Sequence, residues 1–239
     1  MRSYNRSEGG SVTQWAAMFA RQPHAGKVKT RLQSVLSPEQ AANLYTAFLQ
    51  DTAATLATCS ATTKVVVYTG EGAADGLPRL LNSVGDFDYL PQVDGSLGAR
   101  LSGLFDDAFA AGSQSTVVIG TDSPSLPVDF LDQAFDLLRT HEIVVGPSTD
   151  GGYYLIGLSA WIPALFSDDI EWGTGMVLKQ TLAVAAGHRL ALLPVWYDVD
   201  QPGEAAFLRD HLQAQQQAGG LSASRSLAAL EGLDLPPPS

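Results

Sequence analysis

The sequence predicts a single α/β domain in which a mainly parallel sheet carries helices on both faces. Short apolar runs rich in β-branched residues alternate with amphipathic patterns at helical spacing, as in parallel sheets joined by crossover helices. The 239 residues are enough for one large hydrophobic core and marginal for two. Apolar residues make up 45% and charged residues 16% of the chain, which is a globular composition. We therefore expect one folded domain.

That domain is expected over residues 12–218. Residues 1–11 are polar, and we expect them to form a flexible N-terminal segment. Residues 219–239 are rich in Gly, Ser, Ala and Pro, a composition that buries little apolar surface. We expect them to form a mobile or loosely docked tail.

The first half of the domain begins with a strand over residues 12–19 and a long helix over residues 38–58. Ser37 suits the N-cap of this helix, Pro38 its first position, and Gln40 completes a capping box. Apolar residues then recur at helical spacing. The further elements expected in this half are strands over 64–69, 87–90 and 116–120, and helices over 75–82 and 99–111.

The second half starts with a helix over residues 128–140 and a strand over 143–145. The alternation then changes, because residues 149–158 read as a turn followed by an aromatic-rich strand and not as another strand-helix unit. The remaining expected elements are a helix over 174–186, a strand over 190–194 and a last helix over 204–217.

The composition also excludes several classes of protein. No apolar run reaches the roughly 18 residues that cross a bilayer, so no membrane span is expected. Residues 1–11 contain no apolar segment of a secretory signal, and a cytoplasmic location is the expectation. The single cysteine, Cys59, excludes an internal disulfide and a thiolate metal cluster, and it reads as a small apolar residue. The four histidines have no metal-ligand spacing: His24, His141, His188 and His211.

The charge is strongly negative but unevenly distributed. A formal net charge of -11 has the wrong sign for a protein that coats nucleic acid, so no nucleic-acid partner is expected. However, no Asp or Glu occurs between Glu8 and Glu39, and this stretch holds four basic residues. They are Arg21, Lys27, Lys29 and Arg31.

The basic stretch is the first candidate site, over residues 20–32. It follows the first predicted strand, and the first such loop of a doubly wound sheet is the usual place for phosphate. Gly26 allows close approach of the backbone, and the basic side chains supply donors for a polyanion. The alternative is a solvated basic loop, since its spacing matches neither a P-loop nor a dinucleotide-binding fingerprint.

The second candidate, Asp122, lies at the end of the predicted buried strand over 116–120. A carboxylate there suits a hard divalent cation that also binds phosphate oxygens, and Asp122 is a candidate catalytic residue as well. The alternative is that Asp122 caps the next helix or closes a turn before Pro124.

Two further segments carry candidate residues near predicted strand ends. Asp150 is a candidate base or hydroxyl acceptor within residues 146–153, although an Asp-Gly pair is also the commonest tight hairpin turn. Asp198 and Asp200 fall on one side of an extended chain and suit a cation, although Asp200 could instead cap the last helix. Trp172 is a candidate pocket wall or a core residue.

Taken in order, the motifs resemble those of small bacterial nucleotide-diphospho-sugar transferases of GT-A fold. The nearer members are described as selenodomain-associated transferases or arsenosugar-type glycosyltransferases, and phospholactate and molybdenum-cofactor guanylyltransferases are similar at a greater distance. The resemblance spans about residues 12 to 208, and its specificity lies in the ordered set of motifs. These are residues 19–32 (FARQPHAGKVKTRL), 95–100 (GSLGAR), 120–124 (GTDSP), 146–147 (GP) with 150–154 (DGGYY), and 198–200 (DVD).

The resemblance implies a GT-A-like domain that binds a nucleotide with Mg²⁺ or Mn²⁺. It implies that Asp122 is a metal ligand, that Asp198 or Asp200 adds a second, and that Lys29 and Arg31 hold phosphates. The residues expected at the nucleotide and its phosphates are Ala20, Arg21, Gly26, Lys27, Lys29, Arg31, Gly98 and Arg100. Those expected at the sugar or acceptor are Gly151, Gly152, Tyr153 and Trp172.

Two positions depart from the family's usual pattern, namely Arg21, where lysine is common, and Ser123, where cysteine is common. The leading hypothesis is a metal-dependent transferase that binds a nucleotide sugar and a small-molecule acceptor at the carboxyl edge of the sheet. One alternative is a nucleotidyltransferase that releases pyrophosphate from an NTP. The other is a catalytically silent nucleotide-binding domain. The sequence does not identify the base, the sugar, the acceptor or the oligomeric state.

Overall fold

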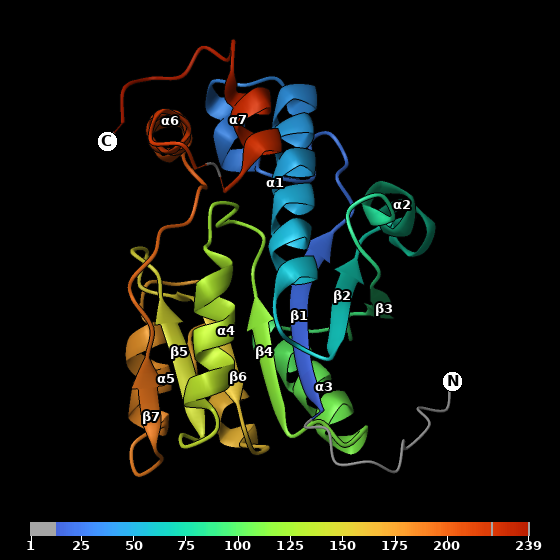
Figure 1. Cartoon of the computed structure of the whole chain (residues 1–239), viewed down its shortest axis with the longest axis vertical. Coiled ribbons are helices and arrows are strands. Elements are labelled where there is room, and N and C mark those ends of the chain that lie inside the picture. The colour runs from blue at the N-terminus through green and yellow to red at the C-terminus, as the bar shows by residue number, and fades with distance from the viewer. Residues whose placement is uncertain (1–12, 221, 239) are drawn as a thin grey trace.

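The computed structural model describes residues 13–220 and 222–238, and its centre is a seven-stranded sheet (Figure 1). The strands are β1 (Gln14–Arg21), β2 (Thr63–Thr69), β3 (Asp88–Pro91), β4 (Ser115–Ile119), β5 (Ile143–Pro147), β6 (Tyr153–Leu158) and β7 (Leu190–Leu192). Their order across the sheet is β3-β2-β1-β4-β6-β5-β7. Only β6 runs antiparallel to its neighbours β4 and β5, and every other pair is parallel. The predicted α/β class with a mainly parallel sheet is confirmed.

Helices cover both faces of this sheet. They are α1 (Pro38–Thr58), α2 (Ala73–Leu81), α3 (Leu97–Ala110), α4 (Val128–Leu137), α5 (Val177–Val184), α6 (Pro202–Gln217) and α7 (Ser224–Leu230), with 3-10 turns η1 (Thr30–Ser34) and η2 (Pro163–Phe166). The predicted capping box of α1 is present. The Ser37 hydroxyl accepts from the Gln40 backbone amide at 3.2 Å, and the Gln40 side chain accepts from the Ser37 amide at 2.8 Å.

Strand β1 shows why both faces are apolar. Met18 packs with α1 and α4 in one buried cluster, whereas Ala17 packs with α3 and η2 in another. Because successive side chains of a strand point to opposite faces, a strand covered on both faces needs apolar residues at every position. The prediction that helices cover both faces of the sheet is therefore confirmed for β1.

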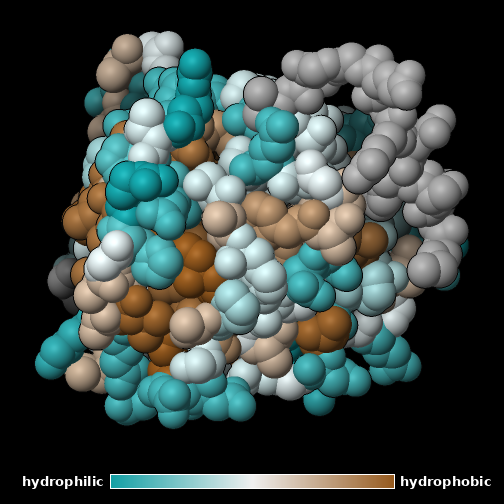
Figure 2. All heavy atoms as spheres, turned by 90° about the horizontal axis from the view of Figure 1, so that it is seen from below, coloured by the Kyte–Doolittle hydropathy of each residue, from teal (hydrophilic) through white to brown (hydrophobic). Residues whose placement is uncertain are grey.

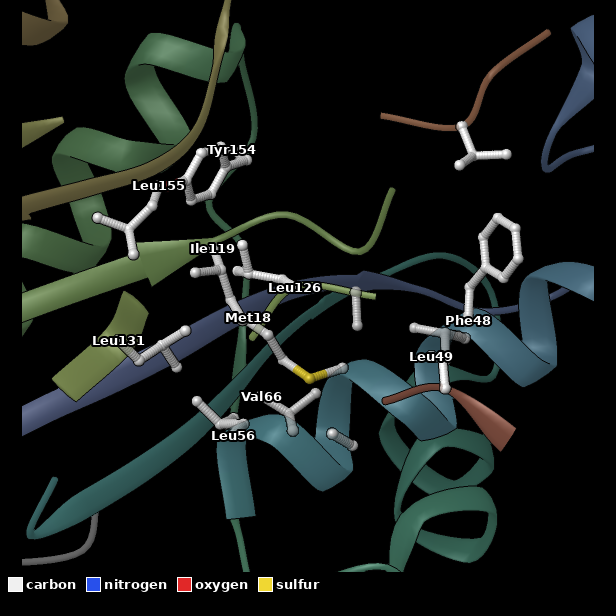
Figure 3. Packing of buried hydrophobic residues seen from close by; sticks show 14 of the residues in the cluster. Met18, Phe48, Leu49, Leu56, Val66, Ile119, Leu126, Leu131, Tyr154 and Leu155 are labelled. Atoms are coloured by element: carbon white, nitrogen blue, oxygen red, sulfur yellow. The ribbon is translucent and has the colours of Figure 1, made fainter. Parts of the chain in front are cut away.

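The larger cluster lies between the sheet and α1, α2 and α4. Figure 3 shows Met18 of β1 and Val66 of β2 packing between Leu56 of α1 and Ile119 of β4. Tyr154 and Leu155 of β6 belong to the same cluster. Burial of these apolar side chains stabilises the sheet whose strand ends carry the site.

The C-terminal segment differs from the expectation of a loosely docked tail. Residues 224–230 form α7, whose Leu227 and Leu230 are buried against α1 and α6. The buried carboxylate of Asp51 accepts hydrogen bonds from both the amide and the hydroxyl of Ser226, each at 2.7 Å. Two leucines on one face of a short helix are enough to dock this Gly-, Ser- and Pro-rich segment. The predicted N-terminal segment, residues 1–11, lies outside the described residues.

The end of the molecule at which the parallel strands begin is seen in Figure 2, where hydrophobic and hydrophilic residues are mixed. None of the helices within residues 13–220 and 222–238 is long and apolar enough to cross a membrane. The site described next lies at the opposite end, where the parallel strands finish.

Candidate functional site

The site forms where the chain changes direction across the sheet. From β1 the chain passes to β2 and β3 on one side, and it returns to β4 on the other side of β1. The loops that follow β1 and β4 therefore diverge and leave a crevice at the carboxyl ends of these strands, which is the usual ligand position in such sheets. The Val199 amide donates to the Asp122 carbonyl at 2.8 Å, which brings residues 198–200 to the same crevice.

Lys29 lies at the centre of the crevice. Its Nζ donates to the Asp122 carboxylate, to Asp200 Oδ1 at 2.9 Å and to the Val199 carbonyl at 2.7 Å. The Lys29 side chain is 3% exposed, whereas those of Asp122 and Asp200 are 46% and 37% exposed. Burial by itself lowers the pKa of Lys29, but the two carboxylates outweigh it and the net shift is upward. Lys29 is therefore charged at neutral pH.

Asp198 joins three loops below this ion pair. One of its oxygens accepts from the Ser123 hydroxyl and the other from the Ser148 hydroxyl, each at 2.5 Å. Burial raises the pKa of Asp198, the two hydroxyls oppose that shift, and the charges of Asp150 and Asp122 add to it. The loop after β4, the turn after β5 and the segment before α6 are thus held together through one carboxylate.

The alternative roles of Asp122 and Asp200 as helix caps are absent. Helix α6 has Gln201 as its N-cap, and Glu204 accepts from the amides of both Asp200 and Gln201 at 2.7 Å. Helix α4 begins at Val128 with Pro127 as its N-cap, five residues beyond the Asp122 position. Both carboxylates are therefore free to face the crevice.

One side of the crevice is a cavity of about 250 Å³ next to the loop after β1. We call it the basic cavity, because it collects all four basic residues of the cationic stretch. Arg31 is 65% exposed and places Nη1 3.5 Å from Asp200 Oδ2. The lining residues are Arg21, Lys27, Val28, Lys29, Thr30, Arg31, Tyr45, Asp122 and Asp200.

The other side is a cavity of about 520 Å³ between β4, β6 and α3, which we call the acidic cavity. Among the residues that the structure describes, Arg31 is the only basic one that lines it, and its carboxylates are Asp122, Asp150, Asp198 and Asp200. Its apolar wall comes from β1, β4, β6, α3, the segment before α5 and the first residue of α5. It includes Phe19, Leu97, Leu101, Val118, Ile119, Ile156, Trp172 and Val177.

The turn between β5 and β6 is a hairpin, as the alternative interpretation of residues 146–153 predicted, and it also lines the acidic cavity. Asp150 Oδ1 accepts from the Gly152 amide at 2.8 Å, which fixes the turn while leaving the carboxylate exposed. Gly151 has φ of +89°, and a Cβ there would come within 2.4 Å of the Gly175 carbonyl. Gly151 therefore serves the close packing of two loops.

The structure brings most of the predicted site residues together. Gly152, Tyr153 and Trp172 line the acidic cavity, and burial raises the pKa of the Tyr153 hydroxyl. Five predicted residues line neither cavity: Ala20, Gly26, Gly98, Arg100 and Gly151. Of these, Ala20 is buried in the core, and Arg100 hydrogen-bonds Gln92 Oε1 at 3.4 Å.

Gly98 acts indirectly on the site. A Cβ at Gly98 would lie 2.4 Å from Nε1 of Trp172 and 2.9 Å from the Phe166 carbonyl. Only glycine leaves room for the indole, whose Nε1 donates to the Ser167 carbonyl at 3.1 Å. Gly98 is thus placed to support the Trp172 wall of the acidic cavity, on the side away from the basic residues.

Sequence reasoning missed Tyr45, and it assigned no role to Ser148 although Ser148 lies within the candidate segment 146–153. Tyr45 reads as a core residue of α1, yet its hydroxyl accepts from the Arg21 amide at 3.1 Å, lies 3.2 Å from the Thr121 hydroxyl and lines the basic cavity. Ser148 reads as a turn residue, yet it binds Asp198. No local pattern distinguishes either, because their partners lie 50 or more residues away for Ser148 and 24 or more for Tyr45.

Comparison with known proteins agrees with this architecture. A family model described as "Uncharacterized protein conserved in bacteria (DUF2064)" matches residues 52–174. A protein from Desulfovibrio desulfuricans G20, provisionally named a nucleotide-diphospho-sugar transferase, is 31% identical, covers 91% of this chain and 93% of its own, and superposes with a TM-score of 0.80. The resemblance to nucleotide-diphospho-sugar transferases is thereby confirmed.

Two more distant structures share the fold alone. The 4-diphosphocytidyl-2C-methyl-D-erythritol synthase from Anaerococcus prevotii DSM 20548 is 10% identical, with 84% of this chain and 96% of its own covered and a TM-score of 0.58. CMP:2-keto-3-deoxy-manno-octonic acid synthetase in complex with CTP is 12% identical, with 85% and 99% covered and a TM-score of 0.53. A comparison with curated proteins gives no match.

Proposed function

The chain belongs to the DUF2064 family. We propose that it is a transferase that binds a nucleotide-diphospho-sugar across the basic and acidic cavities, in line with its likeness to the Desulfovibrio desulfuricans protein. The observation that carries the proposal is the contrast between two adjoining cavities that share Arg31, Asp122 and Asp200. A diphosphate needs cations, and a sugar needs hydrogen-bond acceptors for its hydroxyls together with an apolar wall. The basic cavity supplies the cations, and the acidic cavity supplies the acceptors and the apolar wall. The two cavities meet at the shared carboxylates of Asp122 and Asp200.

In this proposal the basic cavity holds the diphosphate. Arg21, Lys27 and Arg31 present charged donors to it, and Lys29 stands at its inner wall. Arginine can bind two phosphate oxygens at once through its planar guanidinium. Arg31 lies at the border of both cavities, so it is the residue best placed to stabilise the negative charge that develops on the leaving diphosphate. Gly26 leaves open space on the outer side of the same loop.

The acidic cavity takes the sugar and the acceptor. Asp150 is exposed there and is suited to accept a hydroxyl proton, while Tyr153 and Trp172 provide aromatic surface for a sugar ring. Gly152 lets the backbone approach the ligand closely. These assignments make Asp150 the proposed base or hydroxyl-binding residue of the transfer.

The carboxylates suit a divalent cation, Mg²⁺ or Mn²⁺. Asp122 and Asp200 already share one positive charge, the Lys29 ammonium, so their oxygens face a point where a cation is stable. Within the described parts of the chain, no three His, Cys, Asp or Glu side chains are grouped to hold a metal by themselves. Asp122, with Asp198 or Asp200, would therefore hold the ion jointly with phosphate oxygens, as is usual for Mg²⁺. When bound, the ion would neutralise charge on the diphosphate.

A nucleotidyltransferase is the second candidate, and the fold favours it. Cytidylyltransferases share this fold at low identity, and one of them was solved with CTP. On the same site, an NTP would place its phosphates in the basic cavity and release pyrophosphate. The two candidates therefore differ in which bond breaks and not in where the phosphates bind.

Thermal unfolding with ligands tests the proposal. The purified chain is heated with nucleoside di- and triphosphates and nucleotide sugars, each with and without Mg²⁺ or Mn²⁺. A ligand that binds only the folded state raises its stability, by about 2.7 kcal/mol at a hundredfold excess over Kd. A metal-dependent shift with one nucleotide sugar is expected, and no shift with any nucleotide would contradict the proposal.

The nucleotide that binds in this screen is then used as substrate to identify which bond breaks. Sugar transfer releases a nucleoside diphosphate, whereas nucleotidyl transfer from an NTP releases pyrophosphate. Coupled detection of each product, with a panel of hydroxylated acceptors, separates the two activities. Binding without either product would favour a silent nucleotide-binding domain.

A further inference from the structure

Lys29 occupies the place that the divalent cation of the proposed function would need. We propose that Lys29 is an internal counter-cation that must leave Asp122 and Asp200 before a divalent cation binds them, so that metal ion and nucleotide bind together and not independently. This inference rests on the proposed function. It assigns to Lys29 a second role besides phosphate binding, namely control of the order of binding.

The contacts of Lys29 support this role. Its ammonium has three acceptors, which are the carboxylates of Asp122 and Asp200 and the Val199 carbonyl, so all three N–H donors are used. The ring of Phe48 lies 5.4 Å from Nζ and adds a favourable face for a cation. Protein acceptors alone therefore coordinate the ammonium fully.

The exposure of the partners is asymmetric. Lys29 is 3% exposed, whereas Asp122 and Asp200 are 46% and 37% exposed and line both cavities. A dissolved metal ion can therefore reach the carboxylates while the ammonium stands behind them. Two cations on the same pair of carboxylates repel strongly at such short range. Metal affinity is consequently low as long as Lys29 stays in place.

The backbone of Lys29 shows that this position is specifically maintained. Its φ of 46° and ψ of 44° are left-handed, and it is the only non-glycine residue with positive φ among residues 13–220 and 222–238. L-residues adopt this conformation at a cost in free energy, which the ion pairs offset here. A diphosphate in the basic cavity offers the ammonium new anionic partners. That exchange would free Asp122 and Asp200 for the metal ion.

By thermodynamic reciprocity, if the nucleotide raises metal affinity, the metal ion raises nucleotide affinity by the same factor.

The inference is tested with Mn²⁺ alone, by measuring free Mn²⁺ through electron paramagnetic resonance in the absence of any nucleotide. Wild type is compared with Lys29→Met and with Lys29→Gln, which keeps a hydrogen-bond donor but no charge. Both variants are expected to bind Mn²⁺ at least about tenfold more tightly than wild type.

Matched controls identify the cause. Lys27→Met removes a lysine from the same loop, but Lys27 is exposed and solvent screens its charge, so little change in Mn²⁺ affinity is expected. Adding Asp122→Asn to Lys29→Met should abolish the gain. Circular dichroism melts verify that each variant is folded, and Lys29→Gln is the informative variant if Lys29→Met does not fold.

Equal Mn²⁺ affinity in wild type and the folded Lys29 variants would overturn the inference. A gain that survives Asp122→Asn would overturn it too, because Mn²⁺ would then bind elsewhere. Neither result bears on whether a nucleotide binds, which the thermal unfolding screen measures separately. Conversely, absence of nucleotide binding would contradict the proposed function, whatever the Mn²⁺ affinity of Lys29→Met.

Discussion

The basic cavity and the acidic cavity share three lining residues but are built in different ways. All four cations of the basic cavity come from one stretch of 11 residues, Arg21 to Arg31. The carboxylates of the acidic cavity come from three separate segments, at Asp122, Asp150 and Asp198 to Asp200. The first is a local property of one loop, and the second exists only once the sheet has formed.

The two cavities should therefore respond differently to substitution of their lining residues. In the basic cavity Arg21, Lys27 and Arg31 act side by side, so the loss of one charge leaves the others in place. In the acidic cavity Asp198 is held by Ser123 and Ser148 from two other loops, so one change is transmitted to several segments. Single substitutions should therefore cause partial loss of function in the basic cavity and a more complete loss in the acidic cavity.

The largest effect is expected for Asp122→Asn, because Asp122 lies on the border of both cavities and pairs with Lys29. Loss of its charge should lower the rate of transfer by about a hundredfold or more and remove the metal dependence of nucleotide binding. Initial rates and thermal shifts with and without Mg²⁺ measure this. Asp106→Asn, at an exposed position of α3, is the control. Unchanged metal dependence in Asp122→Asn would remove Asp122 from the metal site.

Arg31→Ala should have the next largest effect. A charged hydrogen bond contributes about 1.5–3 kcal/mol, so the nucleotide Kd should rise by roughly tenfold to a hundredfold. Arg31→Lys should recover part of the loss, because lysine keeps the charge but not the planar fork. Isothermal titration with the nucleotide found by the screen measures the Kd. An equal loss in Arg79→Ala, at an exposed position of α2, would show that the effect is not local.

A pair of glycine substitutions in α3 tests the wall of the acidic cavity. Gly98→Ala forces its Cβ against Trp172 and the Phe166 carbonyl, whereas Gly103→Ala meets only the exposed side chain of Val93 at 3.0 Å, which can move toward solvent. Both gain the same helix propensity, so Gly98→Ala should be less stable than Gly103→Ala by about 1–3 kcal/mol.

The same pair of variants separates the two cavities functionally. Displacement of Trp172 in Gly98→Ala should weaken binding of the nucleotide sugar more than binding of the bare nucleoside diphosphate. Denaturant melts give the stability difference, and titration with both ligands gives the affinities. If both ligands lost affinity equally, Gly98 would belong to the nucleotide side, as the sequence motif implied.

The smallest effect concerns pH and the support behind the acidic cavity. The hydroxyl of Tyr197, next to Asp198 in the chain, receives a hydrogen bond from Ser125 Oγ at 3.0 Å and lies 2.7 Å from His211 Nδ1. Burial lowers the pKa of His211 below its ordinary 6.5, so the folded state favours the neutral ring. The stabilisation is present above pH 6.5 and is lost as the pH falls through the lowered pKa of the folded state.

His211→Gln should remove this pH-dependent part of the stability. Its deficit relative to wild type should be larger at pH 8 than at pH 5.5, measured from denaturant melts at both values. His211 does not line the basic cavity, so His211→Gln should bind the nucleotide with the same affinity as wild type at each pH. A deficit that grows toward low pH would mean that the protonated ring is the favoured form.

The α/β class, the bounds of α1 and the segments that carry the charges could be predicted from the sequence, because they follow from local periodicity, capping and composition. Pro38 to Thr58 is helical in the structure as its apolar spacing and capping box predicted. Helix α7 was missed, because its two buried leucines stand in a segment whose composition resembles a linker. Docking against α1 and α6, and not local propensity, decides that helix.

Which of the predicted residues meet could not be predicted from the sequence, because it depends on how the strands and loops are arranged in space. The tertiary structure placed Lys29 between Asp122 and Asp200, contacts that span 93 and 171 residues of sequence, and it separated Gly98 and Arg100 from both cavities. It also brought Tyr45 and Ser148 to the site. Pairings of this kind depend on strand order and on which loops leave the same edge of the sheet, and no local pattern records either. Periodicity and capping depend on residues that are a few positions apart in the sequence, whereas the crevice is made by packing of the whole sheet.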